Sequence, residues 1–329
     1  MSPPALAVET LRILTWTGYA DPDLVKAFEE RHNVRVEVTL VGNDDVLRAR
    51  MAHGQGAQYD VFAANTAEMV HYIDAGLVQP IDVRSIPNTR RQLPRFSRLD
   101  AIPGITRDGK VYAIPYTYSG MGLIYDRRQF KTAPASLSVL WDPHYAGKVL
   151  LFDGGSHNFA LAALALGLDP FHIPPSEAKR VLRKLLALRR NALGFYSLPE
   201  EATRLFREQS AAVLFANYGS QQVKQLQDAD SDIGYVIPRE GALAWLDCWA
   251  ISHGARNKAL AEAWINYTLE PAVSHALTQR QGLDNTLEAS STARARDRLI
   301  WLEPVENDAW RTRLWQRILS GERESSLGL

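Results

Sequence analysis

Short apolar runs alternate with amphipathic segments over residues 11–75, and this alternation constrains the fold more than any other feature. The apolar runs predict strands at 11–16, 34–40 and 59–64, and the segments between and after them predict helices at 44–52 and 67–75. Strands that alternate with helices in this order are typical of a largely parallel sheet covered by helices on both faces.

The rest of the chain shows the same alternation after a loop-rich stretch at 81–106. An extended run at 110–125, with Ser119 and Gly120 at its bend, is suited to cross between two lobes. Further strands are expected at 149–153, 211–215, 233–237 and 242–251, and further helices at 159–168, 176–190, 201–208 and 258–269. A chain of 329 residues is long enough for two domains. We expect lobe 1 at 1–116 plus 250–291 and lobe 2 at 117–249 plus 292–329.

Composition and motifs exclude several classes of protein. Lys plus Arg and Asp plus Glu both number 37, so there is no basic excess for nucleic acid. Cys248 is the only cysteine, and the histidines lack ligand spacing, so no metal site is expected. The chain has no phosphate-binding glycine loop, no Gly-x-Ser-x-Gly elbow and no nucleophile–base pair, and we predict neither an enzyme nor a cofactor.

The N-terminal segment leaves the cellular location open. Residues 1–10 lack the basic start and long apolar core of a signal peptide. Met1–Ala7 is compatible with a start codon joined to a mature N-terminus. Cytoplasmic and processed-export interpretations are equally consistent with this segment.

Two aromatic side chains, Trp16 and Tyr19, stand where the first strand ends. Asp21 can cap the following helix, which has Pro22 at its first position. Ligands of open α/β sheets bind at the carboxyl ends of strands, and aromatic faces suit an organic cation or an alkyl chain. The alternative is that both aromatics belong to the core.

A carboxylate lies between tryptophans on the strand at 242–251. Alternation along the strand puts Trp245, Asp247 and Trp249 on one face. Burying a carboxylate without a partner is costly, so Asp247 either forms a structural ion pair with an arginine or anchors a ligand ammonium.

Two strand-to-helix turns could receive an anion. Gly154, Gly155, Ser156 and His157 open a helix, where exposed amides and the helix dipole favour negative charge. The glycines would let a ligand approach the backbone; alternatively they only make the turn, and Asp153 or Ser156 caps the helix. In the second turn, which follows Phe215, Asn217 and Tyr218 could donate to a carboxylate or be ordinary turn residues.

Together with Asn65-Thr66 and the stretches 76–82, 113–116 and 141–148, these segments resemble the polyamine-binding (spermidine/putrescine-type) periplasmic proteins of ABC importers. The resemblance covers about residues 11–316. It implies a type II periplasmic-binding-protein fold, with two α/β lobes joined by crossing strands and a ligand cleft between them that closes by a hinge. It also implies a monomer in the periplasm, a signal segment absent from this chain, and transfer of the ligand to an inner-membrane ABC permease.

The resemblance also implies roles for individual residues. Trp16, Tyr19 and Trp245 match the aromatic box, and Asp247 matches the amine-binding carboxylate. Asn65 matches a polar pocket position, and Phe215 a position that is usually tryptophan.

The departures from the family are equally informative. The acidic residues that the family carries at the helix start after 149–153 are Gly154 and His157 here, an aromatic after Asn65-Thr66 is Ala67, and an acidic residue before Tyr19 is Gly18. A dication would leave one buried charge uncompensated, at a cost of several kcal/mol.

We therefore predict an ω-amino acid ligand such as 4-aminobutyrate or 5-aminovalerate. Its ammonium would meet Asp247, and its carboxylate would face Ser119, Gly120, the 154–157 turn or the Asn217–Tyr218 turn. The alternatives are a polyamine or agmatine carrier that uses Asp153 or Asp284, an aminophosphonate carrier, an enzyme on the same scaffold, and a metal carrier that uses tyrosines.

Overall fold

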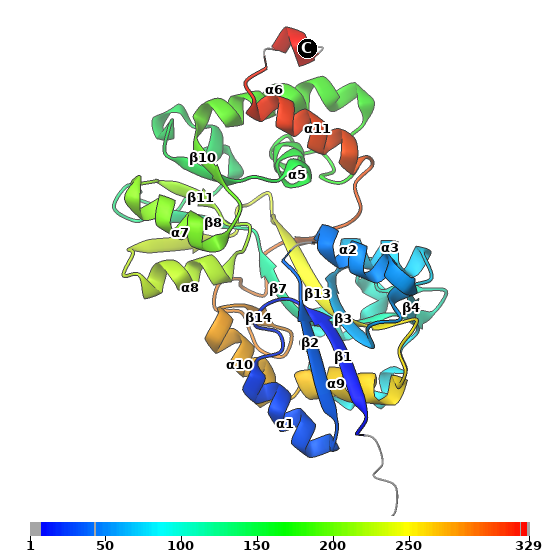
Figure 1. Cartoon of the computed structure of the whole chain (residues 1–329). Coiled ribbons are helices and arrows are strands. Elements are labelled where there is room, and N and C mark those ends of the chain that lie inside the picture. The colour runs from blue at the N-terminus through cyan, green and yellow to red at the C-terminus, as the bar shows by residue number, and fades with distance from the viewer. Residues whose placement is uncertain (1–7, 43, 323, 328–329) are drawn as a thin grey trace, which may run out of the picture. The chain divides into compact units, whose positions relative to one another are not determined.

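The computed structural model describes residues 8–42, 44–322 and 324–327 (Figure 1). The start-codon interpretation of Met1–Ala7 therefore lies outside the described residues. The chain divides into two compact units. Unit 1 is Met1–Tyr118 plus Leu246–Ala289, and unit 2 is Ser119–Trp245 plus Ser290–Leu329. The chain passes between them at Tyr118–Ser119, Trp245–Leu246 and Ala289–Ser290, whereas the sequence analysis placed these changes after Tyr116, Trp249 and Ser291.

One sheet contains most strands of unit 1. Its order is β14-β7-β13-β3-β1-β2, with β4 and β15 also paired to β13. The strands are β1 (Thr10–Thr15), β2 (Arg35–Leu40), β3 (Val61–Asn65), β4 (Val78–Gln79), β7 (Ala113–Gly120), β13 (Ala242–Ser252), β14 (Asp284–Asn285) and β15 (Leu299–Trp301). Two of them, β7 and β13, continue across the division between the units.

The helices of unit 1 follow the predicted alternation closely. They are α1 (Pro22–His32), α2 (Asp44–Ala52), α3 (Thr66–Asp74), α4 (Pro94–Ser97), α9 (Lys258–Thr268) and α10 (Pro271–Gln281). The loop-rich stretch at 81–106 contains several short helical turns. Asp21 occupies the N-cap position of α1, but its side chain makes no capping bond; it accepts a hydrogen bond from Arg280 at 2.8 Å instead. The Asp21 carboxylate, which was expected to cap α1, therefore pairs with the nearby Arg280.

Unit 2 has a five-stranded sheet of order β10-β9-β11-β8-β12. Its strands are β8 (Leu123–Asp126), β9 (Val149–Phe152), β10 (Ala192–Tyr196), β11 (Val213–Phe215) and β12 (Ile233–Val236), and its helices are α5 (Gly155–Ala165), α6 (Ala178–Asn191), α7 (Pro199–Glu208), α8 (Ser220–Asp228) and α11 (Asp308–Leu319). Helices α5, α6 and α11 share one apolar core (Figure 1).

The two-unit α/β architecture is confirmed, but the sheets are mixed rather than mostly parallel. Strand β1 pairs in parallel with β2 and β3, whereas β3 and β13 are antiparallel. In unit 2, β9 is parallel to both of its neighbours, and β8 is antiparallel to both of its own. Parallel neighbours need a crossover connection, usually a helix. Strands β8 and β13 each follow a strand of the other sheet without a helix between, so neither is reached by a strand–helix–strand crossover within its own sheet.

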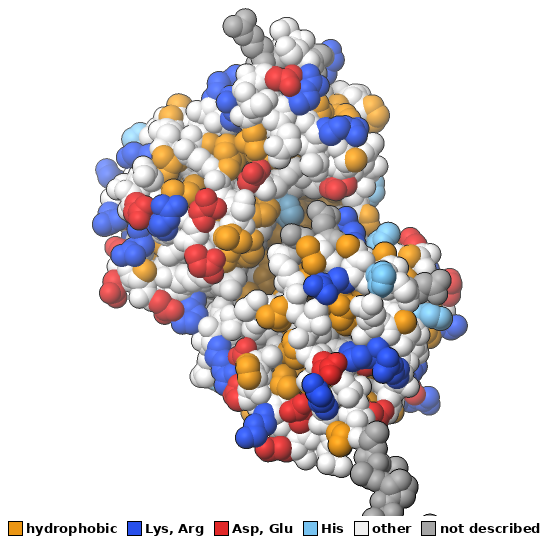
Figure 2. Space-filling model, viewed as in Figure 1, with side chains coloured by type: hydrophobic (Ala, Val, Ile, Leu, Met, Phe, Trp, Pro, Cys, Tyr) orange, Lys and Arg blue, Asp and Glu red, His pale blue; other side chains and the backbone are white. Residues whose placement is uncertain are grey.

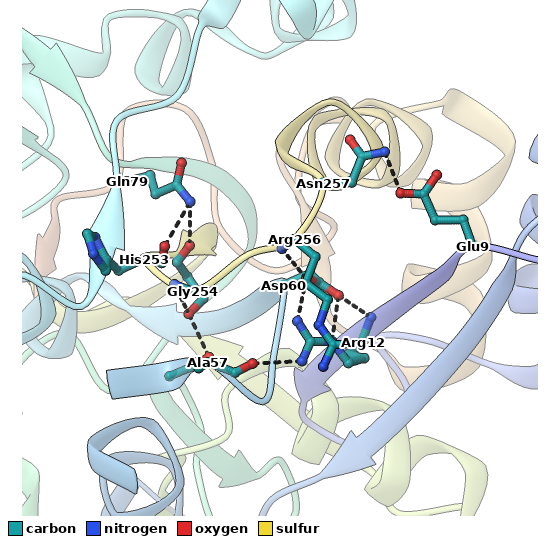
Figure 3. A network of polar contacts seen from close by, with 11 residues as sticks. Glu9, Arg12, Ala57, Asp60, Gln79, His253, Gly254, Arg256 and Asn257 are labelled. Atoms are coloured by element: carbon teal, nitrogen blue, oxygen red, sulfur yellow. Dashed lines mark hydrogen bonds and ion pairs between the residues drawn. The ribbon is translucent and has the colours of Figure 1, made fainter. Parts of the chain in front are cut away.

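A buried ion pair ties three segments of unit 1 together (Figure 3). Arg12 of β1 donates from Nε and Nη2 to Asp60, just before β3, at 3.0 and 2.7 Å. Asp60 also accepts from the Arg256 amide at 2.8 Å, and Arg12 donates to the Ala57 carbonyl at 2.7 Å. Burial opposes ionisation of Asp60, but the hydrogen bonds from Arg12 and from backbone amides outweigh it and hold the pKa of Asp60 below its usual value. The pair fixes the end of β3 opposite to Asn65.

The surface agrees with the balanced composition. Figure 2 shows acidic and basic side chains interspersed on the visible face of each unit. Of the helices in the described ranges, none combines the length and apolar character that a membrane span requires.

Candidate functional site

The turn after β1 brings Tyr19 to Asp247 in unit 1. Gly18 takes a φ of +88°, a conformation that favours glycine, and the Tyr19 amide donates to the Trp16 carbonyl at 3.3 Å. The Tyr19 hydroxyl then donates to Asp247 Oδ2 at 2.6 Å. Both side chains are nearly enclosed, with Tyr19 5% and Asp247 8% exposed. A residue from the end of β1 and one from β13, 228 positions apart, thus form one polar pair.

Asp247 has no cationic partner among the described residues. It lies opposite Asn65 in the antiparallel pairing of β13 with β3. Burial raises the pKa of Asp247 to about 7, against the opposing effect of the Tyr19 hydrogen bond. The alternative that Asp247 forms a structural ion pair with an arginine is therefore not found among the described residues. A buried carboxylate without a cation is suited to receive one from a ligand.

Aromatic rings surround Tyr19 on its protein side. Its ring packs edge-on against Tyr116 and Trp249, with ring centroids 5.5 and 6.4 Å apart. Trp249 is fully buried and packs in turn on Trp264, so it is a core residue. Trp16 is half-buried, and its indole Nε1 has no hydrogen-bond partner. Trp16 is therefore the most exposed ring of this group.

Asn65 and Gly18 have structural explanations. Asn65 caps α3, because its Oδ1 accepts from the Glu68 amide at 3.1 Å. A Cβ on Gly18 would lie 2.4 Å from the Gln281 side chain. Gln281 of α10 therefore fills the space where the family carries an acidic side chain. Nothing in the sequence pattern singled out Gln281, because it is remote in sequence from Gly18.

The start of α5 is uncapped in unit 2. Gly154 occupies the N-cap position without a side-chain bond. The amides of Gly155, Ser156 and His157 have no acceptor within the described residues, since the first bonded amide is that of Asn158, to the Gly154 carbonyl. Burial lowers the pKa of His157 to about 4, although Asp308 opposes the shift, so this imidazole is neutral near pH 7. The start of α5 offers backbone donors, and the buried Arg311, paired with Glu306, donates to the Ser156 carbonyl at 3.5 Å.

The two glycines of this turn are required by packing. A Cβ on Gly155 would lie 2.9 Å from Thr312 Cα of α11, and one on Gly154 would lie 2.5 Å from the Phe152 ring. Protein atoms therefore occupy the space that a Cβ would take, which gives both glycines a structural reason; a ligand at the backbone of this turn stays a prediction. Asp153 accepts from the Trp315 indole at 2.9 Å, which gives its carboxylate a structural partner. Asp284, the other acidic residue considered, is 3% exposed within β14.

Asp308 is a carboxylate that sequence reasoning missed. It begins α11, and its Oδ1 accepts a hydrogen bond from the Ser156 hydroxyl at 2.5 Å. Arg311, fully buried in the next turn, forms an ion pair with Glu306 and donates to the Pro170 carbonyl at 3.0 Å. The positive character of the α5 start is thus opposed by one acidic side chain. Its separation of 152 residues from Ser156 hid it from motif analysis.

The start of α8 is already occupied by protein groups. Ser119 Oγ accepts from the Ser220 amide at 2.9 Å, and the Gly120 carbonyl accepts from the Tyr235 hydroxyl at 2.7 Å. The Tyr218 hydroxyl donates to the Ser197 carbonyl at 2.7 Å. These groups are therefore engaged within unit 2, unlike the amides of α5.

Asn217, Trp245 and Phe215 lie close to the start of α8. The Trp245 indole donates to the Asn217 carbonyl at 3.2 Å, and Asn217 Oδ1 is buried without a partner. Trp245 is half-buried, and Phe215 is a core residue at 1% exposure. Trp245 and Asn217 are thus in contact within unit 2. In the described part of the chain no group of His, Cys, Asp and Glu is arranged to hold a metal.

Comparison with solved structures defines the class. The spermidine/putrescine ABC transporter substrate-binding protein from Streptococcus pneumoniae superposes with a TM-score of 0.78 at 21% identity, over 94% of this chain and 98% of that one. A structure titled Atu4243-GABA receptor gives 0.73 at 15% identity, over 96% and 99% of the two chains. The fold is that of the type II periplasmic binding proteins.

The sequence comparisons identify the family. The model of the bacterial extracellular solute-binding protein family matches residues 23–294, and the chain belongs to this family. Spermidine/putrescine-binding periplasmic protein 1 of Haemophilus influenzae is 27% identical over 276 residues, which cover 83% of this chain and 74% of the relative. Members of the family bind solutes rather than convert them, and the resemblance to polyamine-binding proteins is confirmed.

Proposed function

We propose that this protein binds a zwitterionic ω-amino acid, such as 4-aminobutyrate or 5-aminovalerate, and delivers it to an ABC permease. The ligand ammonium pairs with Asp247 of unit 1, and the ligand carboxylate accepts hydrogen bonds from the start of α5 in unit 2. The protein acts as a monomer in the periplasm, which is where its named relatives work.

The uncapped start of α5 carries the proposal. Three consecutive amides, those of Gly155, Ser156 and His157, have no acceptor among the described residues, and no side chain caps them. A helix start with free amides and the positive end of the dipole favours an anion, by roughly 0.3–1 kcal/mol from the dipole alone and more from each charge-assisted hydrogen bond. An ammonium at this position would meet donors instead of acceptors.

Asp247 is the proposed partner of the ligand ammonium. This carboxylate is 8% exposed and is hydrogen-bonded to Tyr19 without a cation beside it. Removing a partner from a buried charge costs about 3–5 kcal/mol, so an ammonium that restores a partner gains much of its binding energy here. The half-buried Trp16 ring supplies an apolar face beside it.

The neighbours supply a precedent for the fold but not for the ligand. The solved structure titled as a GABA receptor has the same fold at 15% identity, and the relatives are named for spermidine and putrescine. The choice between these ligand classes therefore depends on the groups of this chain.

Asp308 favours a second candidate, a polyamine such as putrescine. Its carboxylate is bonded to Ser156 at the start of α5 and is exposed. A second ammonium could pair with Asp308 in place of the acidic residues that the family carries at Gly154 and His157. The two candidates therefore differ in the ligand group beside Asp308, which is a carboxylate for the zwitterion and an ammonium for the polyamine.

Isothermal titration of the full chain tests the proposal. Titrating 4-aminobutyrate, 5-aminovalerate, 3-aminopropylphosphonate, agmatine, putrescine and spermidine ranks the ligand classes. We expect the zwitterions to bind and putrescine to bind at least about tenfold more weakly, a difference of about 1.4 kcal/mol. Tight putrescine binding without a response to either amino acid would reject the proposal.

The variant Asp308→Asn gives a second, independent answer. For a zwitterion, removing the carboxylate beside the ligand anion strengthens binding. For a polyamine, the same change removes a partner and weakens binding. Asp228→Asn, a surface carboxylate of the same unit that pairs with Lys224, is the matched control and changes neither affinity.

A further inference from the structure

We infer that Tyr19 makes the Asp247 anchor selective for a primary ammonium over a guanidinium. The inference rests on the proposed function for the position of the ligand cation, but not on the chemistry of the ligand's other end. It concerns which cationic head group this carboxylate accepts.

The Tyr19 hydroxyl is hydrogen-bonded to one of the two carboxylate oxygens of Asp247. It donates to Asp247 Oδ2 at 2.6 Å, within the range of a strong charge-assisted hydrogen bond. A guanidinium binds a carboxylate best through two parallel N–H donors, one to each oxygen. With Oδ2 engaged by Tyr19, Asp247 offers only Oδ1 without competition.

Tyr19 is held in this position from several sides. Its ring packs edge-on against Tyr116 and Trp249, and its amide is bonded to the Trp16 carbonyl. Gln281 stands against Gly18 on the other side of the turn. Asp247 is fixed by the pairing of β13 with β3. A guanidinium that bonds both oxygens has to compete with the Tyr19 hydroxyl at Oδ2, and weakening the bond of a nearly enclosed hydroxyl is costly.

An ammonium fits the same arrangement without displacing Tyr19. It needs one carboxylate oxygen for a salt bridge, and its remaining donors are free for other acceptors. The phenolic oxygen of Tyr19 keeps acceptor capacity while it donates to Asp247. A primary ammonium therefore contacts Oδ1 and the Tyr19 oxygen together, and the Tyr19–Asp247 pair is preserved.

Two ligand pairs that differ only in their head groups test the inference on the full chain by titration calorimetry. One pair is 4-aminobutyrate and 4-guanidinobutyrate; the other is putrescine and 1,4-diguanidinobutane, whose two ends are identical. In whichever pair binds, we expect the amino member to bind about tenfold more tightly or better, the equivalent of one charge-assisted hydrogen bond. A ratio near one contradicts the inference.

The variant Tyr19→Phe then tests the cause. Freeing Oδ2 should weaken the amino ligand and reduce the head-group ratio to about threefold or less. Tyr72→Phe removes a buried hydroxyl of the same unit that has no partner, and it should leave the ratio unchanged. An unchanged ratio in Tyr19→Phe overturns the assignment to Tyr19. If that variant does not fold, the wild-type ratio still decides, because a ratio near one contradicts selectivity.

The outcomes separate this inference from the proposed function. Binding of the dication pair alone rejects the zwitterion, while the head-group ratio of that pair still tests Tyr19. Binding of neither pair overturns both, because no cation would then be received by Asp247.

Discussion

Asp247 combines a proposed binding role with a cost in stability. Its carboxylate is buried beside Tyr19, and burial raises its pKa to about 7. In the unfolded chain the same group has a pKa near its ordinary value of 3.8. The folded state therefore holds the proton more firmly, and the contribution of Asp247 to the free energy of unfolding falls as pH rises from about 4 to about 7.

The variant Asp247→Asn should be more stable than the wild type at pH 8 while losing amine binding. A neutral amide removes the penalty of a buried charge and still accepts from Tyr19, for a gain of about 1–3 kcal/mol at pH 8 and little gain at pH 4. Urea unfolding of the free proteins at both pH values measures this. Equal destabilisation of the variant at pH 4 and pH 8 would show that burying the charged Asp247 carboxylate does not cost stability.

Amine binding should weaken on acidification. Below about pH 7 the free protein carries a protonated Asp247, and the ligand must displace that proton. The affinity then falls by up to about tenfold per pH unit, and binding near pH 6 releases protons. Calorimetry in buffers of different ionisation heat counts those protons. The same affinity at pH 5.5 and pH 8 would exclude Asp247 as the cation anchor.

At the scale of elements, the two helix starts of unit 2 differ in what satisfies them. The start of α8 is closed by Ser119, whereas the start of α5 has free amides in the described chain. Both follow a strand and a glycine-containing turn, so the sequence pattern could not separate them. The difference lies in β7, which carries Ser119 to α8 from 101 residues away.

The variant Ser119→Ala should therefore affect stability but not ligand affinity. Loss of a capping hydroxyl costs about 1 kcal/mol, and somewhat more where the amide is buried. Thermal unfolding and titration with 4-aminobutyrate measure the two effects. A large loss of affinity with unchanged stability would return the ligand carboxylate to the start of α8.

The elements themselves were largely predictable from sequence. Periodicity placed α2 at the observed residues and β1, β3 and β9 to within two residues, because each has a clear apolar pattern and a clear stop. The direction of β8 and β13 was not predictable, because each strand follows a strand of the other sheet and no local pattern encodes how it pairs in its own. The 154–157 turn was placed at the start of a helix, but the helix range expected at 159–168 begins earlier, at Gly155, because packing against α11 holds the poor helix formers Gly155 and Ser156 in place.

The contacts of the candidate site residues could not be predicted from sequence. Asp247, Tyr19 and the α5 start were proposed from strand ends and from family resemblance, and their role in binding stays a prediction. The Tyr19–Asp247 bond, the capping role of Ser119 and the carboxylate of Asp308 depend on residues 100 or more positions apart. No local pattern encodes such contacts.

At the scale of the whole molecule, the proposed function predicts how affinity depends on the spacing of the two charges of the ligand. The proposed ligand carries its ammonium and its carboxylate at opposite ends, so a ligand with both charges on one carbon should not satisfy both proposed partners. We expect glycine and alanine not to bind, and affinity to rise through β-alanine to a maximum at 4-aminobutyrate or 5-aminovalerate. A titration series over chain length measures this. A preference for α-amino acids would contradict the proposed ω-amino acid ligand.

A crystal structure of the full chain with bound 4-aminobutyrate tests the central claim most directly. The account predicts the ammonium nitrogen within hydrogen-bond distance of Asp247 Oδ1 and the carboxylate oxygens on the amides of Gly155, Ser156 and His157. A ligand carboxylate found elsewhere, or a co-purified diamine held between Asp247 and Asp308, would contradict it.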